Sequence, residues 1–213
     1  HYNNKDSVLL TLAIIVYYLA YRLSTKNNLK YAILLGIAGG FFANMKIIGI
    51  PVWGFVVVCV LAEKIIRKKC DKKFIFNVIV ASVTAIVSLY ILTPAMWKDV
   101  VHYVKFGIEQ AQDFRWCDYV LFNGQIVSKS LAGIPRKYLP FMIIFTTPVG
   151  ILLLDLLGIV GTIVGIAKKK IDSKYLYAIY VSICALFPVG YVVIKAIPLY
   201  NSWRHFYFVY YIP

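Results

Sequence analysis

The chain is organised around residues 93–138, which read TPAMWKDVVHYVKFGIEQAQDFRWCDYVLFNGQIVSKSLAGIPRKY. This is the one long polar stretch in an otherwise apolar sequence, and it contains four of the nine acidic residues. A polar connection of this length between apolar segments is more often a functional element than a simple link. The side of the membrane on which it lies therefore decides which other polar residues it can work with.

The composition of the chain is that of a polytopic membrane protein. Hydrophobic residues make up 61% of the 213 residues, and the mean hydropathy is +0.76. Soluble domains are nearer one half apolar, whereas long apolar runs with at most one charge are typical of membrane spans. The net charge of +14 does not indicate a nucleic-acid partner, because the basic residues stand in short clusters between the apolar runs, where they set topology. The four cysteines show no metal-binding spacing.

The apolar runs predict an all-α fold of about six transmembrane helices and the start of a seventh. We expect the first span at about 8–23. The next apolar stretch, 31–66, would measure about 54 Å as one helix, against a hydrocarbon core of about 30 Å. We therefore predict two spans that meet near Lys46–Pro51. The remaining spans are expected at 74–92, 139–167 and 175–197, and from about 206.

Basic residues assign each loop to one side of the membrane. Three loops hold 13 of the 23 Lys and Arg residues, at 22–30, 64–73 and 168–174. The positive-inside rule places these loops in the cytoplasm. The polar stretch 93–138 is then extracytoplasmic, as are His1–Ser7, Asn44–Gly49 and Pro198–His205. We expect any chemistry to be assembled at this outer face of a cell membrane.

The polar stretch itself predicts a short amphipathic helix in the membrane interface. Apolar residues recur at helical spacing in its first part, at Val100, Val101, Val104, Ile108 and Ala111. The pair Asn123-Gly124 predicts a tight turn further along.

Three short segments of the outer face supply candidate site residues. His1 and Asp6 could hold a divalent metal, or Asp6 could be a helix N-cap. Lys46 could face a lipid phosphate, or it could be a snorkelling lysine. Arg204 and His205, in the segment NSWRHFYF, could recognise phosphate, or they could anchor a helix at the interface.

The acidic residues of the polar stretch are a further set of candidates. A pair of carboxylates such as Asp99 and Asp118 could act as a general base and a metal ligand, or the acids could form the solvated face of the interfacial helix. Arg136 could hold an anionic headgroup or pair with these acids. Asp155 lies inside the predicted span 139–167, and we interpret it as a structural contact between helices.

Five stretches together resemble a known family. They are HYNNKD (1–6), GIAGGFFANMKIIGIPV (36–52), TPAMW (93–97), WCDYVLFNGQIVSKSLAGIPRKYLPFMIIFTTPVGILLL (116–154) and YNSWRHFYFVY (200–210). They are similar to the protein O-mannosyltransferase-like (family 39) branch of the GT-C membrane glycosyltransferases, in particular its bacterial members. The resemblance covers nearly the whole chain, which would be part of one transmembrane domain.

The resemblance implies an inverting transferase. Such an enzyme passes a sugar from a polyprenyl-phosphate donor to a protein, glycan or lipid acceptor at the extracytoplasmic face, with a carboxylate as general base. That carboxylate lies in the family's first outer loop, which we expect upstream of His1, because the chain reads as an internal segment of a longer protein. Asp6 matches the family's second acidic position, where some members hold a metal or the donor phosphate. Arg204 and His205 match its Trp-Arg-His segment near the lipid phosphate, so we expect Lys46, Arg204 and His205 to bind that group.

The loop departs from the family at one point and leaves two other functional classes open. Where the family has Pro-Trp-Tyr, this chain reads Pro135-Arg136-Lys137-Tyr138, so an aromatic acceptor contact is in doubt there. Asp99, Asp118 and Arg136 are retained as acceptor-side candidates. A lipid or solute transporter or flippase would share the hydropathy, and a non-catalytic membrane subunit would share the motifs.

Overall fold

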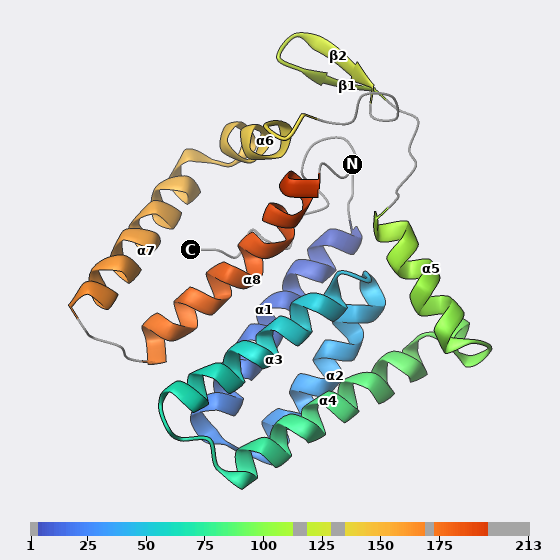
Figure 1. Ribbon diagram of the computed structural model, residues 1–213, viewed down its shortest axis with the longest axis vertical. Coiled ribbons are helices and arrows are strands. Elements are labelled where there is room, and N and C mark those ends of the chain that lie inside the picture. Colours follow the sequence, from blue (N-terminus) through green and yellow to red (C-terminus); the bar gives the residue numbers. More distant parts are fainter. Residues whose placement is uncertain (1–3, 113–118, 129–134, 169–172, 196–213) are drawn as a thin grey trace. The chain divides into compact units, whose positions relative to one another are not determined.

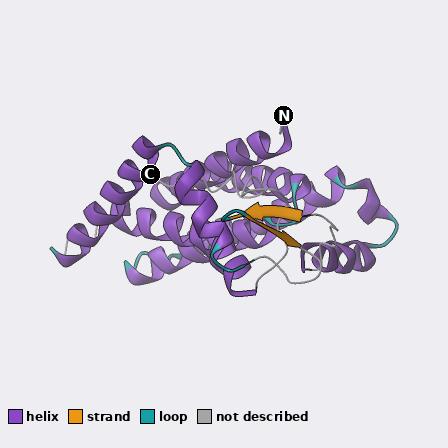
Figure 2. Cartoon of the chain, turned by 90° about the horizontal axis from the view of Figure 1, so that it is seen from above, coloured by secondary structure: helices purple, strands orange, loops and turns teal. Residues whose placement is uncertain are grey.

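The computed structural model describes residues 4–112, 119–128, 135–168 and 173–195. The chain divides into two units, His1–Ile108 (unit 1) and Glu109–Pro213 (unit 2). Each unit is mostly helical, as Figure 2 shows. The all-α prediction is therefore confirmed, apart from one short hairpin in unit 2.

Unit 1 is built from four long helices. These are α1 (Asn4–Lys26), α2 (Leu29–Met45), α3 (Gly49–Ile66) and α4 (Lys72–Leu92). The short 3-10 helix η1 (Pro94–Trp97) follows, and then the amphipathic helix α5 (Val100–Gln112) begins. Figure 1 shows their order along the chain. The predicted break near Lys46–Pro51 is confirmed, because Lys46 leaves α2 with extended backbone and α3 begins three residues later.

Side-chain caps fix where two of these helices begin. The Asn28 side chain accepts a hydrogen bond from the backbone N–H of Lys30 and starts α2. Asp71 Oδ1 accepts one from the backbone N–H of Phe74 at 2.7 Å and starts α4. Such caps satisfy backbone donors that have no partner within the helix. The two tight turns of unit 1 are thus determined by local sequence.

Helix α2 lies at the centre of unit 1 and packs against α1, α3 and α4. Its contact with α4 is close because glycines face that helix. A Cβ atom at Gly36 would lie 2.6 Å from the carbonyl oxygen of Ala81, and one at Gly40 would lie 2.5 Å from Ser88 Cβ. Both distances are too short for real carbon contacts, so only glycine permits this approach. Small residues give membrane helices their closest packing in the same way.

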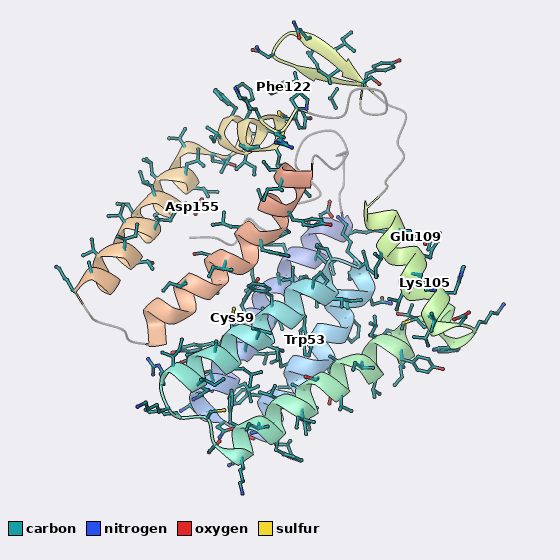
Figure 3. The ribbon with its side chains drawn as sticks, viewed as in Figure 1. Trp53, Cys59, Lys105, Glu109, Phe122 and Asp155 are labelled. Carbon is teal, nitrogen blue, oxygen red and sulfur yellow. The ribbon has the colours of Figure 1, made fainter. Side chains whose placement is uncertain are left out.

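Unit 2 begins with an antiparallel hairpin that docks on a helix. The strands β1 (Tyr119–Phe122) and β2 (Gln125–Ser128) pair around Asn123-Gly124. The positive φ angles of Asn123 (51°) and Gly124 (77°) suit a two-residue hairpin turn. The predicted turn is confirmed. The Phe122 ring packs edge-on against Tyr138 and Phe141 of the next helix, α6 (Tyr138–Thr146), with ring centroids 5.5 and 5.4 Å apart (Figure 3).

The remaining helices of unit 2 are α7 (Val149–Ala167) and α8 (Ser173–Lys195), which contact each other. The predicted span over 139–167 consists of two helices, α6 and α7, which meet at a bend of 110°, the geometry of a broken span or of a re-entrant loop. The break falls at Thr147-Pro148, where Thr147 has extended backbone. A residue before proline is disfavoured in the helical region, and proline cannot donate a helical hydrogen bond.

Fewer helices qualify as membrane spans than the sequence predicts. Within the described ranges, α1, α3 and α4 are long and apolar enough to cross a membrane, and α6 with α7 would add a fourth if the bent pair is one span. Helix α2 and the segment Val181–Ile194 of α8 are shorter apolar helices. The predicted seventh span, from about 206, lies outside the described residues. Several long apolar helices are compatible with an integral membrane protein.

The glycine contact between α2 and α4 generates a prediction. Gly36→Ala is expected to lower the free energy of unfolding by about 1–3 kcal/mol, the usual cost of overpacking, because the new methyl group would press on the Ala81 carbonyl. Gly54→Ala in α3 is the matched control, since a Cβ there meets no atom within 4 Å. That change should be neutral, or stabilising by up to about 1 kcal/mol. Thermal unfolding of the full-length protein in detergent measures both, and equal effects would contradict the proposed contact.

Candidate functional site

The candidate site is built on an ion pair between Asp6 and Lys46. The Lys46 ammonium donates a hydrogen bond to Asp6 Oδ1, joining the first turn of α1 to the end of α2. The Asp6 side chain is 5% exposed and that of Lys46 is 26% exposed. A carboxylate this deeply buried is tolerated only when it is paired and hydrogen-bonded. The alternative that Asp6 is an N-cap is wrong, because α1 already includes Asn4.

A second polar contact lies at the same end of α2. Asn44 Nδ2 donates to the carbonyl oxygen of Leu92 at 3.0 Å and to Thr93 Oγ1 at 2.8 Å. Thr93 is buried and is the C-cap residue of α4. The amide of Asn44 therefore satisfies the end of α4, where a helix leaves carbonyl groups without partners. Through this contact the start of the polar stretch 93–138 is held beside the Lys46 segment.

Helix α5 contacts the same region. A Cβ atom at Gly107 would lie 2.6 Å from Ile47 Cδ1, so the helix rests against the link between α2 and α3. The indole N–H of Trp97, in η1, donates to the carbonyl oxygen of Tyr90 at 2.8 Å and fixes the chain where it turns from α4 toward α5. We call the set formed by Asp6, Asn44, Lys46, Thr93 and Gly107 the Asp6 end of unit 1.

The structure brings some of the predicted site residues together and not others. Asp6 and Lys46 form a direct pair. Asp99 caps α5 instead, because its Oδ1 accepts a hydrogen bond from the backbone N–H of His102 at 2.9 Å. Arg136 is exposed in the turn before α6, in unit 2. The other predicted residues, His1, Asp118, Arg204 and His205, lie outside the described residues.

The donor set at the Asp6 end does not by itself fit a divalent metal. Asp6 contributes a single carboxylate, and that carboxylate is already hydrogen-bonded to an ammonium group. Mg²⁺ and Ca²⁺ take six or more oxygen ligands. Across the described ranges, no group of three or more His, Cys, Asp or Glu side chains could hold a metal ion.

Sequence reasoning missed Asn44 and Thr93 as members of the site. Both flank residues that were singled out, since Asn44 is two residues from Lys46 and Thr93 opens the polar stretch. The available signal was the position of each residue, because Asn44 and Thr93 are polar residues at the ends of apolar runs. It did not identify a partner, because the two residues are 49 positions apart in the sequence.

Comparisons with known proteins give no match. No protein-family model, no curated protein and no solved structure matches the chain.

A double-mutant cycle tests the pair. Asp6→Asn leaves a partly buried ammonium without its counterion, and Lys46→Gln leaves a buried carboxylate without its donor. Each change is expected to lower the free energy of unfolding by about 1–3 kcal/mol, less than for a fully buried pair because Lys46 is partly exposed. The double variant should lose at least about 1 kcal/mol less than the sum of the single changes. Thermal unfolding of the full-length protein gives the coupling energy, and additive losses would show that the pair contributes nothing.

Proposed function

We propose that the chain is part of a membrane glycosyltransferase that moves a sugar from a polyprenyl-phosphate donor to an acceptor at the extracytoplasmic membrane face. One observation carries the proposal: Lys46, which the sequence assigns to the donor phosphate, is hydrogen-bonded to Asp6, which matches the family's second acidic position, although 40 positions separate the two residues. The family resemblance of residues 1–6, 36–52 and 93–97 supports it, because these three segments supply every residue of the Asp6 end except Gly107.

Lys46 is the donor-binding residue in this proposal. Its ammonium carries three N–H donors, and the exposed fraction of the side chain gives a phosphate oxygen access to it. Asp6 is a positioning residue, because its buried carboxylate fixes the ammonium at the end of α2. A positively charged donor stabilises the negative charge that develops on the phosphate as the sugar leaves.

The reaction itself follows from the chemistry of a sugar phosphate. An acceptor hydroxyl oxygen forms a bond to the anomeric carbon while the bond from that carbon to the phosphate oxygen breaks. The hydroxyl proton passes to a carboxylate base, as the family resemblance implies. The polyprenyl phosphate leaves with the bonding electrons, and its chain stays in the bilayer.

The rest of the Asp6 end suits a reaction at a membrane surface. Helix α5 has exposed apolar side chains at Val100, Val101 and Phe106 and exposed polar ones at His102 and Lys105. Such a helix lies stably in the interface between lipid and water. We propose that the chain contributes six spans and the start of a seventh to a cell membrane, and that Arg204 and His205 add to the phosphate contacts.

Lys46→Gln in the full-length protein tests the donor role. The KM for a polyprenyl-phosphate sugar is expected to rise about tenfold, since a hydrogen bond to a charged group contributes about 1.5–3 kcal/mol and each 1.4 kcal/mol is a factor of ten. Lys46→Arg should recover part of the loss. The measurement is sugar transfer at varied donor concentration with purified protein.

Lys98→Gln is the matched control for that experiment, because Lys98 is an exposed lysine at the end of η1. The KM of the Lys98→Gln protein for the polyprenyl-phosphate sugar should stay unchanged. A Lys46→Gln protein that is folded, by its thermal midpoint, and that keeps the original KM would overturn the donor role. Arg204→Ala, measured alongside, tests the second phosphate contact predicted from the sequence.

A lipid or solute transporter is the second candidate function, and Asp155 is the observation that favours it. This residue lies within the apolar helix α7, and Figure 3 shows its side chain on the side toward α8. Its Oδ1 is buried and has no hydrogen-bond partner within the part of the chain that the structure describes. Carboxylates inside membrane helices often mark transport pathways.

Asp155→Asn separates the two functions. A transferase that works at the Asp6 end should keep its rate of sugar transfer. A transporter should lose translocation of labelled lipid or solute across proteoliposomes, because the substitution removes the charge that carries the substrate or its proton. Loss of translocation in a protein that transfers no sugar would replace the first proposal with the second.

A further inference from the structure

Unit 1 carries a strongly basic surface at the end away from Asp6, where α1 leads into α2 and α3 leads into α4 (Figure 1). We call it the basic end. Its cationic residues are Arg22, Lys26, Lys30, Lys64, Arg67, Lys68, Lys69, Lys72 and Lys73. Residues 22–30 and 63–73 contain two acids, Glu63 and Asp71, against these nine bases, a formal surplus of +7.

The two turns of the basic end are held together by side-chain hydrogen bonds. Ser24 Oγ donates to Glu63 Oε2, and both side chains are buried. Asn27 Nδ2 donates to Asp71 Oδ1 at 3.1 Å, and Asn77 Nδ2 donates to Asn27 Oδ1 at 2.8 Å. These bonds join α1, α3 and α4. The basic residues therefore project from a fixed framework and not from two independent loops.

Both acids of the basic end are engaged in hydrogen bonds, although Glu63 is buried and Asp71 is exposed. Glu63 is 4% exposed, accepts from Ser24 and lies 3.4 Å from Arg67 Nε. Asp71 caps α4 and accepts from Asn27. Their charges are thus taken up by the framework, whereas Lys68, Lys69, Lys72 and Lys73 are exposed. The surface outside the framework is nearly all cationic.

Exposed apolar side chains stand directly beside these lysines. Ile65 and Ile66 are 64% and 62% exposed at the end of α3, and Ile75 and Phe76 are 45% and 58% exposed in the first turns of α4. A band of apolar side chains next to lysines fits the boundary between acyl chains and headgroups, where lysine extends its charge toward the water. A soluble acidic partner would leave this apolar band exposed to water.

We propose that the basic end is a binding surface for the headgroups of anionic phospholipids, with Lys69, Lys72 and Lys73 as its principal contacts. The ammonium groups pair with the lipid phosphodiester, and the neighbouring apolar side chains contact the acyl chains. The hydrogen-bonded framework holds the cations in place before a lipid binds, which reduces the ordering cost of binding. This lipid selectivity belongs to the folded protein and is independent of the proposed transferase function, because it uses none of the same residues.

The experiment compares two lipids on the full-length protein. The protein is placed in nanodiscs of dioleoylphosphatidylglycerol and dioleoylphosphatidylethanolamine, extracted in mild detergent, and analysed for the lipids it retains. Phosphatidylglycerol should be enriched over its share of the nanodisc. In the variant Lys69→Gln/Lys72→Gln/Lys73→Gln the enrichment should fall at least about fivefold, because each lysine near an anionic surface contributes to binding. Raising the salt concentration should lower it in the original protein.

The matched control removes three exposed lysines of unit 1 that lie outside the basic end, as Lys5→Gln/Lys98→Gln/Lys105→Gln. This variant changes the net charge by the same amount and should keep the enrichment of phosphatidylglycerol. Equal retention of both lipids by the original protein would overturn the proposal. So would an equal loss in both triple variants, since the effect would then reflect net charge alone. The thermal midpoint of each variant, measured without added lipid, shows that the framework is still folded.

Discussion

The close approach of α2 to α4 is the constraint on which the rest of unit 1 depends. Gly36 and Gly40 let the two backbones come together, and a methyl group at Gly36 would have no space. This contact sets the position of α2 along α4, so that Asn44 reaches Thr93. The same position leaves the end of α2 beside the first turn of α1, where Lys46 meets Asp6. The candidate site is thus a consequence of helix packing and not of a separate binding loop.

Desolvation explains why the polar residues of unit 1 gather at its two ends. Ionised side chains in the middle of apolar helices are costly, so the four helices carry their charges at their termini. The Asp6 end and the basic end accommodate their charges in different ways. At the Asp6 end one acid and one base neutralise each other inside the protein. At the basic end the acids support the framework, and the surplus cations face outward. The Asp6–Lys46 pair therefore carries no net charge, whereas the basic end is a positively charged surface.

The sequence predicted the helices of unit 1 well because their signals are local. The interruption near Lys46 acts within a few residues, as do the caps Asn28 and Asp71, which the structure added. The bend between α6 and α7 was also marked locally, by Pro148, but the apolar run continues across it and hid the break. The pair of Asp6 with Lys46 could not be derived from spacing, because it depends on how α1 and α2 pack. Hairpin strands were missed because four residues on each side of Asn123-Gly124 carry too little pattern.

The ion pair also limits how the Asp6 end can hold a phosphate. Asp6 and Lys46 together carry no net charge, so Lys46 can orient a phosphate oxygen while the pair alone cannot neutralise it. The surplus cations of the basic end are too distant to help, since α1 alone, with 23 residues, is about 34 Å long. Compensation of the phosphate charge then requires a cation besides the pair. In the proposed function, Lys46 accordingly binds and orients the donor phosphate, while Asp6 positions the Lys46 ammonium.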